Sequence, residues 1–108
     1  MQTAITIKAI DYEYILFSDG SMITYDHPQD CCEDNWADFS QLDTLARNYT
    51  FKGRIRFEAV DGSGFRFGDS RRMFFVPCYS DQNGYYTDII DIYYQGENVL
   101  EFSAEMRD

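Results

Sequence analysis

The fold is decided by residues 54–60, Arg-Ile-Arg-Phe-Glu-Ala-Val, in which charged and apolar side chains alternate before the final valine. Successive side chains of a β-strand point to opposite faces of the sheet, so a period of two predicts a strand with one buried and one solvated face. The next four residues, Asp61-Gly62-Ser63-Gly64, have the composition of a tight turn. This stretch therefore predicts a mainly β protein.

Three more segments towards the N-terminus also predict strands. Apolar and polar residues alternate within 3–10, and aromatic and aliphatic side chains dominate 12–17 and 22–25. Asp19-Gly20 separates the last two segments, and Asp-Gly between two β segments is a strong hairpin signal. We expect these three segments to share one sheet.

The C-terminal half continues the same pattern. Asn83-Gly84 predicts another hairpin connection. Pro77 cannot donate a backbone hydrogen bond, so it suggests a sheet edge or a bulge. The remaining strands are expected at 72–79, 85–94 and 99–106.

One helix is expected, at about 40–47. Ser40 has an acidic residue three positions later, which resembles a helix N-cap. Leu42, Leu45 and Ala46 then fall on one helical face. The sequence therefore predicts a single domain, 1–108, of the mainly β (α+β) class. We expect about seven antiparallel strands in a curled sheet or small sandwich, with one short helix packed on it.

The charge of the chain limits its partners. The formal net charge is −10, and the first 50 residues hold nine acidic and two basic residues. Nucleic-acid binding needs a basic surface, so direct binding to nucleic acid is not expected. Two readings stay open: attraction to a basic partner, or a solvated face that only keeps the protein soluble.

The location of the protein is predicted from the same sequence. It contains no apolar run long enough to cross a membrane, and its N-terminus lacks the pattern of a signal peptide. Three cysteines, two of them adjacent, make a poor disulfide framework. We therefore expect a soluble protein of the cytosol with reduced thiols.

The segment that contains the only histidine suggests a metal site. Thiolate and imidazole groups are the usual ligands of zinc, and His27, Asp30, Cys31 and Cys32 lie close together in the chain. We expect these four residues to bind zinc or another transition metal in a structural site. Whether Cys78, Asp19 or Glu33 joins them is left open.

The cysteines have two other interpretations. A free cysteine often packs as a small buried hydrophobe, and this alternative stays open. Catalysis by Cys31 or Cys32 with His27 is not favoured, because acidic neighbours raise the pKa of a thiol and oppose a reactive thiolate. The protein is therefore not expected to be an enzyme.

Two short motifs resemble a known family. Residues 27–33 have the form H-x-x-D-C-C-E, and residues 83–87 read Asn-Gly-Tyr-Tyr-Thr. Together they resemble signatures of a small family of uncharacterised proteins of bacteriophages and mobile elements. The resemblance spans about residues 12–93 and departs from the family pattern at Pro28 and Thr87. It implies a β-hairpin before the first motif and a strand pair near the second.

The family has no established activity, but a phage setting implies a function. Small acidic phage proteins are often inhibitors of host defence, including anti-CRISPR proteins. We therefore expect an anti-CRISPR-like inhibitor that binds the basic surface of a bacterial nuclease effector, most plausibly of the Cas9 type. The residues expected at the contact are Asp26, Glu33, Asp34, Trp36, Asp38 and Asp43.

Two rival functions are retained. A small-ligand sponge for a nucleotide immune signal would need an aromatic pocket with basic residues, for which Arg54, Arg56 and Arg66 are candidates. A metal-dependent hydrolase would use the acidic residues near His27. A specific nucleotide should stabilise a sponge, and a chelator should inactivate a hydrolase.

Overall fold

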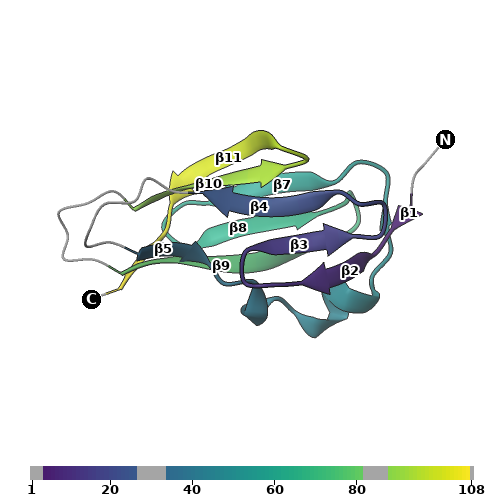
Figure 1. Cartoon of the computed structure of the whole chain (residues 1–108), viewed down its shortest axis with the longest axis horizontal. Coiled ribbons are helices and arrows are strands. Elements are labelled where there is room, and N and C mark those ends of the chain that lie inside the picture. The colour runs from purple at the N-terminus through teal and green to yellow at the C-terminus, as the bar shows by residue number, and fades with distance from the viewer. Residues whose placement is uncertain (1–3, 27–33, 82–87, 108) are drawn as a thin grey trace.

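The computed structural model describes residues 4–26, 34–81 and 88–107, and its architecture is mainly β, as the sequence predicts (Figure 1). The described residues form two five-stranded sheets and one small two-stranded pair. The first sheet is antiparallel throughout and has the strand order β11-β10-β4-β3-β2. Its strands are β2 (Ile7–Ile10), β3 (Tyr14–Phe17), β4 (Met22–Asp26), β10 (Ile89–Tyr94) and β11 (Glu97–Ser103).

The second sheet is centred on the long strand β9. The first part of β9 pairs with β8, while its last part pairs with both β5 and β12, and the β12 pairing is parallel. The strands of this sheet are β5 (Asp34–Ala37), β7 (Arg56–Val60), β8 (Gly64–Gly68), β9 (Met73–Asp81) and β12 (Glu105–Arg107). The small pair joins β1 (Ala4–Ile5) to β6 (Phe51–Lys52).

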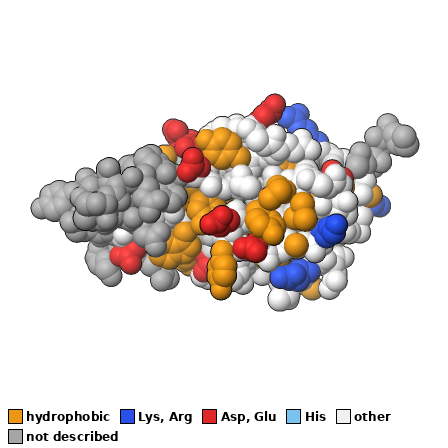
Figure 2. Space-filling model, in the orientation of Figure 1, with side chains coloured by type: hydrophobic (Ala, Val, Ile, Leu, Met, Phe, Trp, Pro, Cys, Tyr) orange, Lys and Arg blue, Asp and Glu red, His pale blue; other side chains and the backbone are white. Residues whose placement is uncertain are grey.

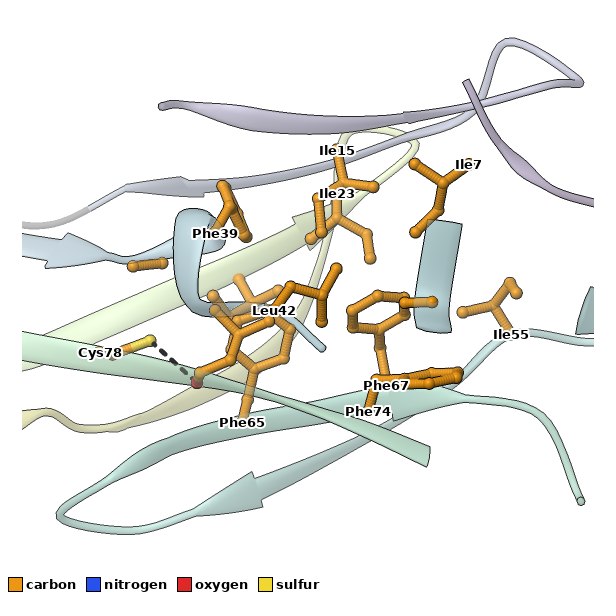
Figure 3. Close-up of a cluster of buried hydrophobic side chains, with 14 of the residues drawn as sticks. Ile7, Ile15, Ile23, Phe39, Leu42, Ile55, Phe65, Phe67, Phe74 and Cys78 are labelled. Carbon is orange, nitrogen blue, oxygen red and sulfur yellow. Dashed lines mark hydrogen bonds between the residues drawn. The ribbon is translucent and has the colours of Figure 1, made fainter. Parts of the chain in front are cut away.

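The core lies between the two sheets (Figure 3). Ile15 and Ile23 of the first sheet face Phe65 and Phe67 of the second, and all four side chains have no exposed surface. Phe17 adds edge-to-face ring contacts with Phe67 and other aromatic side chains. The architecture is therefore a small sandwich, and each sheet turns its other face outward.

The predicted helix is replaced by two short 3₁₀ helices, η1 (Phe39–Gln41) and η2 (Thr44–Asn48). Asp38 and Asp43 cap them, whereas the sequence pointed to Ser40 as the cap. Each aspartate accepts a hydrogen bond from the backbone N–H two residues later, so the chain restarts its turn at Asp43 instead of continuing one helix. Leu45 is consequently exposed, although it was expected on the buried face.

The described residues contain twelve strands, more than the seven expected. The difference arises because the strand expected at 3–10 is divided into β1 and β2, the strand expected at 99–106 is divided into β11 and β12, and β5, β6 and β8 were not expected. β6 has only two residues, and β8 begins and ends with glycine, which hides a strand pattern. The predicted Asp-Gly hairpin is confirmed, because Gly20 has a positive φ of 88° between β3 and β4. The predicted Asn83-Gly84 hairpin lies outside the described residues.

Two glycines of β8 allow the second sheet to form. A Cβ atom at Gly64 would collide with the backbone carbonyl oxygen of Val76, and one at Gly68 with that of Arg72. Both sites are buried at the β8–β9 pairing. The backbone φ of Gly68 is not in the positive range that favours glycine. Glycine is therefore needed at this position only because the β9 backbone lies too close to leave room for a side chain.

Candidate binding groove

A groove lies where the two sheets and the 3₁₀ helices meet. It has a volume of about 800 Å³ and opens to solvent. The β2–β3 turn, the end of β4, the edge strand β5 and the start of η1 form its walls. The lining residues are Ile10, Asp11, Tyr12, Tyr25, Trp36, Ala37, Asp38, Phe39, Ser40 and Arg47.

Four of the ten residues that line the groove are aromatic. Tyr12 is 86% exposed, which is unusual for so large a side chain. Trp36 packs against the Tyr79 ring, with centroids 5.5 Å apart, and Tyr25 packs edge-to-face on the buried Phe39 at 6.0 Å. The walls are therefore fixed by packing, while Tyr12 stands free in solvent.

Two carboxylates add negative charge. Asp38 accepts hydrogen bonds from the backbone N–H and the hydroxyl of Ser40, and from Gln41 Nε2 at 2.7 Å. Asp11 accepts from the Tyr12 N–H at 2.6 Å. These bonds hold both carboxylates in place. Arg47 of η2 also lines the groove and contributes one positive charge.

A smaller hollow adjoins the groove on the first sheet. Its volume is about 420 Å³, and its lining includes Glu13, Tyr14 and Asp26. Tyr25 lines both depressions and so joins them. The groove and the hollow together form one continuous surface of aromatic and acidic side chains.

The residues predicted at a partner contact are only partly brought together. Trp36 and Asp38 line the groove, and Asp26 lines the adjoining hollow. Asp43 lies elsewhere, where it caps η2 with its side chain 3.7 Å from Arg72 Nη2. For the other two, Asp34 is described only as the first residue of β5, and Glu33 lies outside the described residues.

The predicted metal ligands His27, Asp30, Cys31 and Cys32 all lie outside the described residues. Within 4–26, 34–81 and 88–107, no three His, Cys, Asp or Glu side chains are grouped so that they could hold a metal ion. Asp19, one of the optional ligands, instead accepts hydrogen bonds from the Ser21 backbone N–H at 2.9 Å and hydroxyl at 2.6 Å.

The third cysteine behaves as a core residue. Cys78 has no exposed surface, and its thiol lies 3.9 Å from the Val76 carbonyl oxygen. Burial, with a smaller effect of the Asp38 charge, raises the pKa of the Cys78 thiol far above its usual range. This thiol is therefore protonated at neutral pH and is not a reactive nucleophile.

The arginines considered for a nucleotide lie apart from the groove. Arg54, Arg56 and Arg66 are exposed around the β7–β8 hairpin of the second sheet. Arg66 forms an ion pair with Glu58 of β7, the strand beside its own. The basic residue that does line the aromatic groove is Arg47.

Sequence reasoning missed several groove residues, among them Asp11, Tyr12, Tyr25 and Arg47. Asp11 falls between the predicted strands 3–10 and 12–17, but Tyr12 was expected in the second of them, whereas the structure places both residues in the turn between β2 and β3. A bulky aromatic beside such a turn is a detectable signal for an exposed contact residue. The positions of Tyr25 and Arg47 depend on how β4 and η2 pack together with β5, which no local pattern reveals.

Comparison with known proteins adds no relative: no family model, no curated protein and no solved structure matches this chain. In the described part of the chain, no helix has the length and apolar character needed to cross a membrane.

Proposed function

We propose that this chain is a non-enzymatic binding protein that docks a basic segment of a partner protein in the groove. One observation carries the proposal: the 86%-exposed Tyr12 lines one groove together with Asp11, Trp36 and Asp38. Exposed aromatics and tryptophan are typical anchors of protein interfaces.

A basic side chain is the occupant that such walls favour. An arginine or lysine gains a cation–π interaction over a tyrosine or tryptophan ring and a charge-assisted hydrogen bond to a carboxylate. The net charge of −10 attracts a basic surface over a longer range and speeds association. Arg47 also lines the groove, so it would favour a partner segment that carries a carboxylate or a backbone carbonyl group next to its basic side chain.

The finer proposal is that the partner is a bacterial nuclease effector, most plausibly of the Cas9 type, which the chain inhibits in the bacterial cytosol. It is supported by the acidic charge and by the resemblance of residues 27–33 and 83–87 to phage proteins. Such effectors hold nucleic acid in positively charged channels, which an acidic aromatic surface can occupy.

The experiment measures DNA cleavage by a guide-loaded Cas9-type effector at increasing concentrations of the chain. We expect dose-dependent inhibition that weakens with rising salt and is reduced at least about tenfold by Tyr12→Ala with Asp11→Asn. Met106→Ala is the matched control, because Met106 is also an exposed apolar side chain (43%) and lies on β12, away from the groove. No inhibition by the wild type would reject this partner, while leaving the groove open to another basic protein.

A small-ligand sponge is the second candidate, and Arg47 is the observation that favours it. A guanidinium beside aromatic rings could bind the phosphate of a nucleotide whose base stacks on Trp36 or Tyr12. Thermal unfolding with a panel of cyclic and linear nucleotides tests it. A rise in Tm with one nucleotide that Arg47→Ala abolishes would favour the sponge over the protein-binding function.

A further inference from the structure

We infer that the outer face of the first sheet is part of the same docking surface and receives a basic, extended or helical segment of the partner protein. This inference rests on the proposed function and deepens it, because it names the surface beyond the groove and the charge pattern of the partner. The sheet face is continuous with the groove through Tyr25, which lines both the groove and the adjoining hollow.

Three carboxylates form a row across this sheet. Asp26 of β4 pairs in register with Asp91 of β10, and Asp91 pairs in register with Glu101 of β11. Residues directly opposite each other on neighbouring strands have side chains on the same face. The neighbouring pair Ile90 and Phe102 is buried, so the carboxylate row is on the outer face.

One part of the row is unfavourable for the isolated protein, namely the pair of Asp91 and Glu101. Like charges directly opposite each other on neighbouring strands repel. Asp91 stands between the other two, and its Oδ1 is buried without a hydrogen-bond donor in the described structure. A buried carboxylate oxygen without a donor has lost its hydration without compensation. A cationic side chain laid across the row would offset the repulsion between Asp91 and Glu101.

A second row supplies apolar contact beside the carboxylates. Tyr14, Thr24 and Tyr93 pair in register across β3, β4 and β10, two residues along from Asp26 and Asp91. Two residues of a strand span about 6.6 Å, so this row of two tyrosines and a threonine runs parallel to the acidic row at that spacing. All three side chains are half-buried and so remain available for contact. Arginine suits this pattern, because its planar group stacks on rings and pairs with carboxylates.

The distribution of charge favours a protein over a nucleic acid on this face. Figure 2 shows the face: carboxylates and hydrophobic side chains lie close together on it, and basic side chains lie towards the other end of the molecule. Arg66, Arg71 and Arg72, which form ion pairs with acidic residues, belong to β8 and the β8–β9 turn of the second sheet. Phosphates would be repelled by the acidic row, whereas a basic segment is complementary to it.

The test uses a fluorescein-labelled nona-arginine peptide as the probe and measures its anisotropy with the full chain. Asp91→Asn and Glu101→Gln should each weaken binding about three- to tenfold, as expected for the loss of one partly screened charge contact. The same two variants should unfold at a higher urea concentration than the wild type, since they relieve the repulsion. Glu105→Gln removes an equal charge from exposed β12 and should change neither property.

A variant that was merely misfolded would lose both binding and stability, whereas the row variants are expected to bind more weakly and to be more stable. The inference fails if Asp91→Asn and Glu101→Gln bind the probe as tightly as Glu105→Gln while Tyr12→Ala weakens binding; the groove proposal then stands. Weakening by the row variants but not by Tyr12→Ala would support the sheet face and reject the groove. A wild type that does not bind the probe, or row variants that lose stability, would overturn the inference.

Discussion

The hydroxyl of Tyr49 lies 2.8 Å from Oδ1 and 3.0 Å from Oδ2 of Asp69, a carboxylate whose side chain is fully buried. Asp69 also accepts hydrogen bonds from the backbone N–H groups of Lys52, Arg71 and Arg72, at 3.0, 2.9 and 3.1 Å. Arg71 closes the cluster with an ion pair at 3.2 Å. One carboxylate thus joins β6, the segment after η2 and the β8–β9 turn.

Asp69→Asn should therefore be strongly destabilising. The neutral amide replaces a charged acceptor by a weaker one and places an NH₂ group where backbone N–H groups point at the side chain. We expect a loss of about 2–4 kcal/mol in the free energy of unfolding, measured by urea denaturation. Asp61→Asn is the control, because Asp61 is exposed and accepts a single backbone hydrogen bond, from Ser103. A loss no larger than that of the control would show that the cluster does not stabilise the fold.

The stabilisation by Asp69 should depend on pH. Burial alone would raise the pKa of Asp69, but hydrogen bonds from Lys52, Arg71, Tyr49 and Arg72 outweigh it and hold the pKa well below its usual range. The folded state therefore binds its proton at lower pH than the unfolded state, where the pKa is about 3.9. The stabilisation is fully present above that value and is lost as the pH falls below it.

Urea denaturation of the wild type and Asp69→Asn between neutral pH and about pH 2 measures this effect. The difference in stability between the two proteins should stay constant above about pH 5 and shrink below about pH 4. A difference that does not change with pH would contradict a lowered pKa at Asp69. Comparing the two proteins cancels the titration of the many other carboxylates.

Gly68→Ala should disrupt the second sheet. The added methyl group would collide with the Arg72 carbonyl oxygen, so β8 and β9 must separate locally. We expect a loss of at least about 2 kcal/mol, read from the urea midpoint. Gly53→Ala is the contrasting variant, because Gly53 has open space around its Cα but a φ of +78°. It should cost about 1 kcal/mol, from backbone strain alone. Equal costs for the two variants would argue against the close approach.

The sandwich was largely predictable because its long strands carry local signals. Residues 54–60 alternate between charged and apolar side chains, and in the structure Ile55 is buried while Arg56 and Glu58 are exposed. The Asp19-Gly20 pair is a second local signal, and it correctly predicted the turn of the β3–β4 hairpin. The helix predicted at 40–47 was wrong in detail. The spacing of Leu42, Leu45 and Ala46 does not reveal that the Asp38 and Asp43 side chains accept backbone hydrogen bonds and so start two short 3₁₀ helices in place of one helix.

The candidate site was predictable only in its charge. Of the residues expected from the acidic run, the fold places Asp26, Trp36 and Asp38 on one continuous surface, and their role in binding stays a prediction. The partners that complete this surface come from distant segments, such as Tyr12 and Arg47, and depend on tertiary packing. The carboxylate row was also hidden, because Asp26 and Glu101 approach Asp91 through strand register and not through sequence spacing.

Metal binding by His27, Asp30, Cys31 and Cys32 stays a prediction. Elemental analysis of the purified chain should give about one zinc or other transition-metal ion per molecule. Cys31→Ser, Cys32→Ser and His27→Ala should each lower this content, while Cys78→Ser should retain the metal, because Cys78 is buried in the core. Wild-type protein that carries no metal, even after incubation with zinc, would remove the metal site.

The central claim is that a basic segment docks in the groove, and amide chemical-shift mapping tests it most directly. The ¹⁵N-labelled chain is titrated with the nona-arginine peptide at low salt. We predict the largest shifts at Asp11, Tyr12 and 36–40, extending to Asp26 and Asp91, and their loss in the variant Tyr12→Ala with Asp11→Asn. Shifts centred on the β7–β8 hairpin, or none at saturating peptide, would contradict the account.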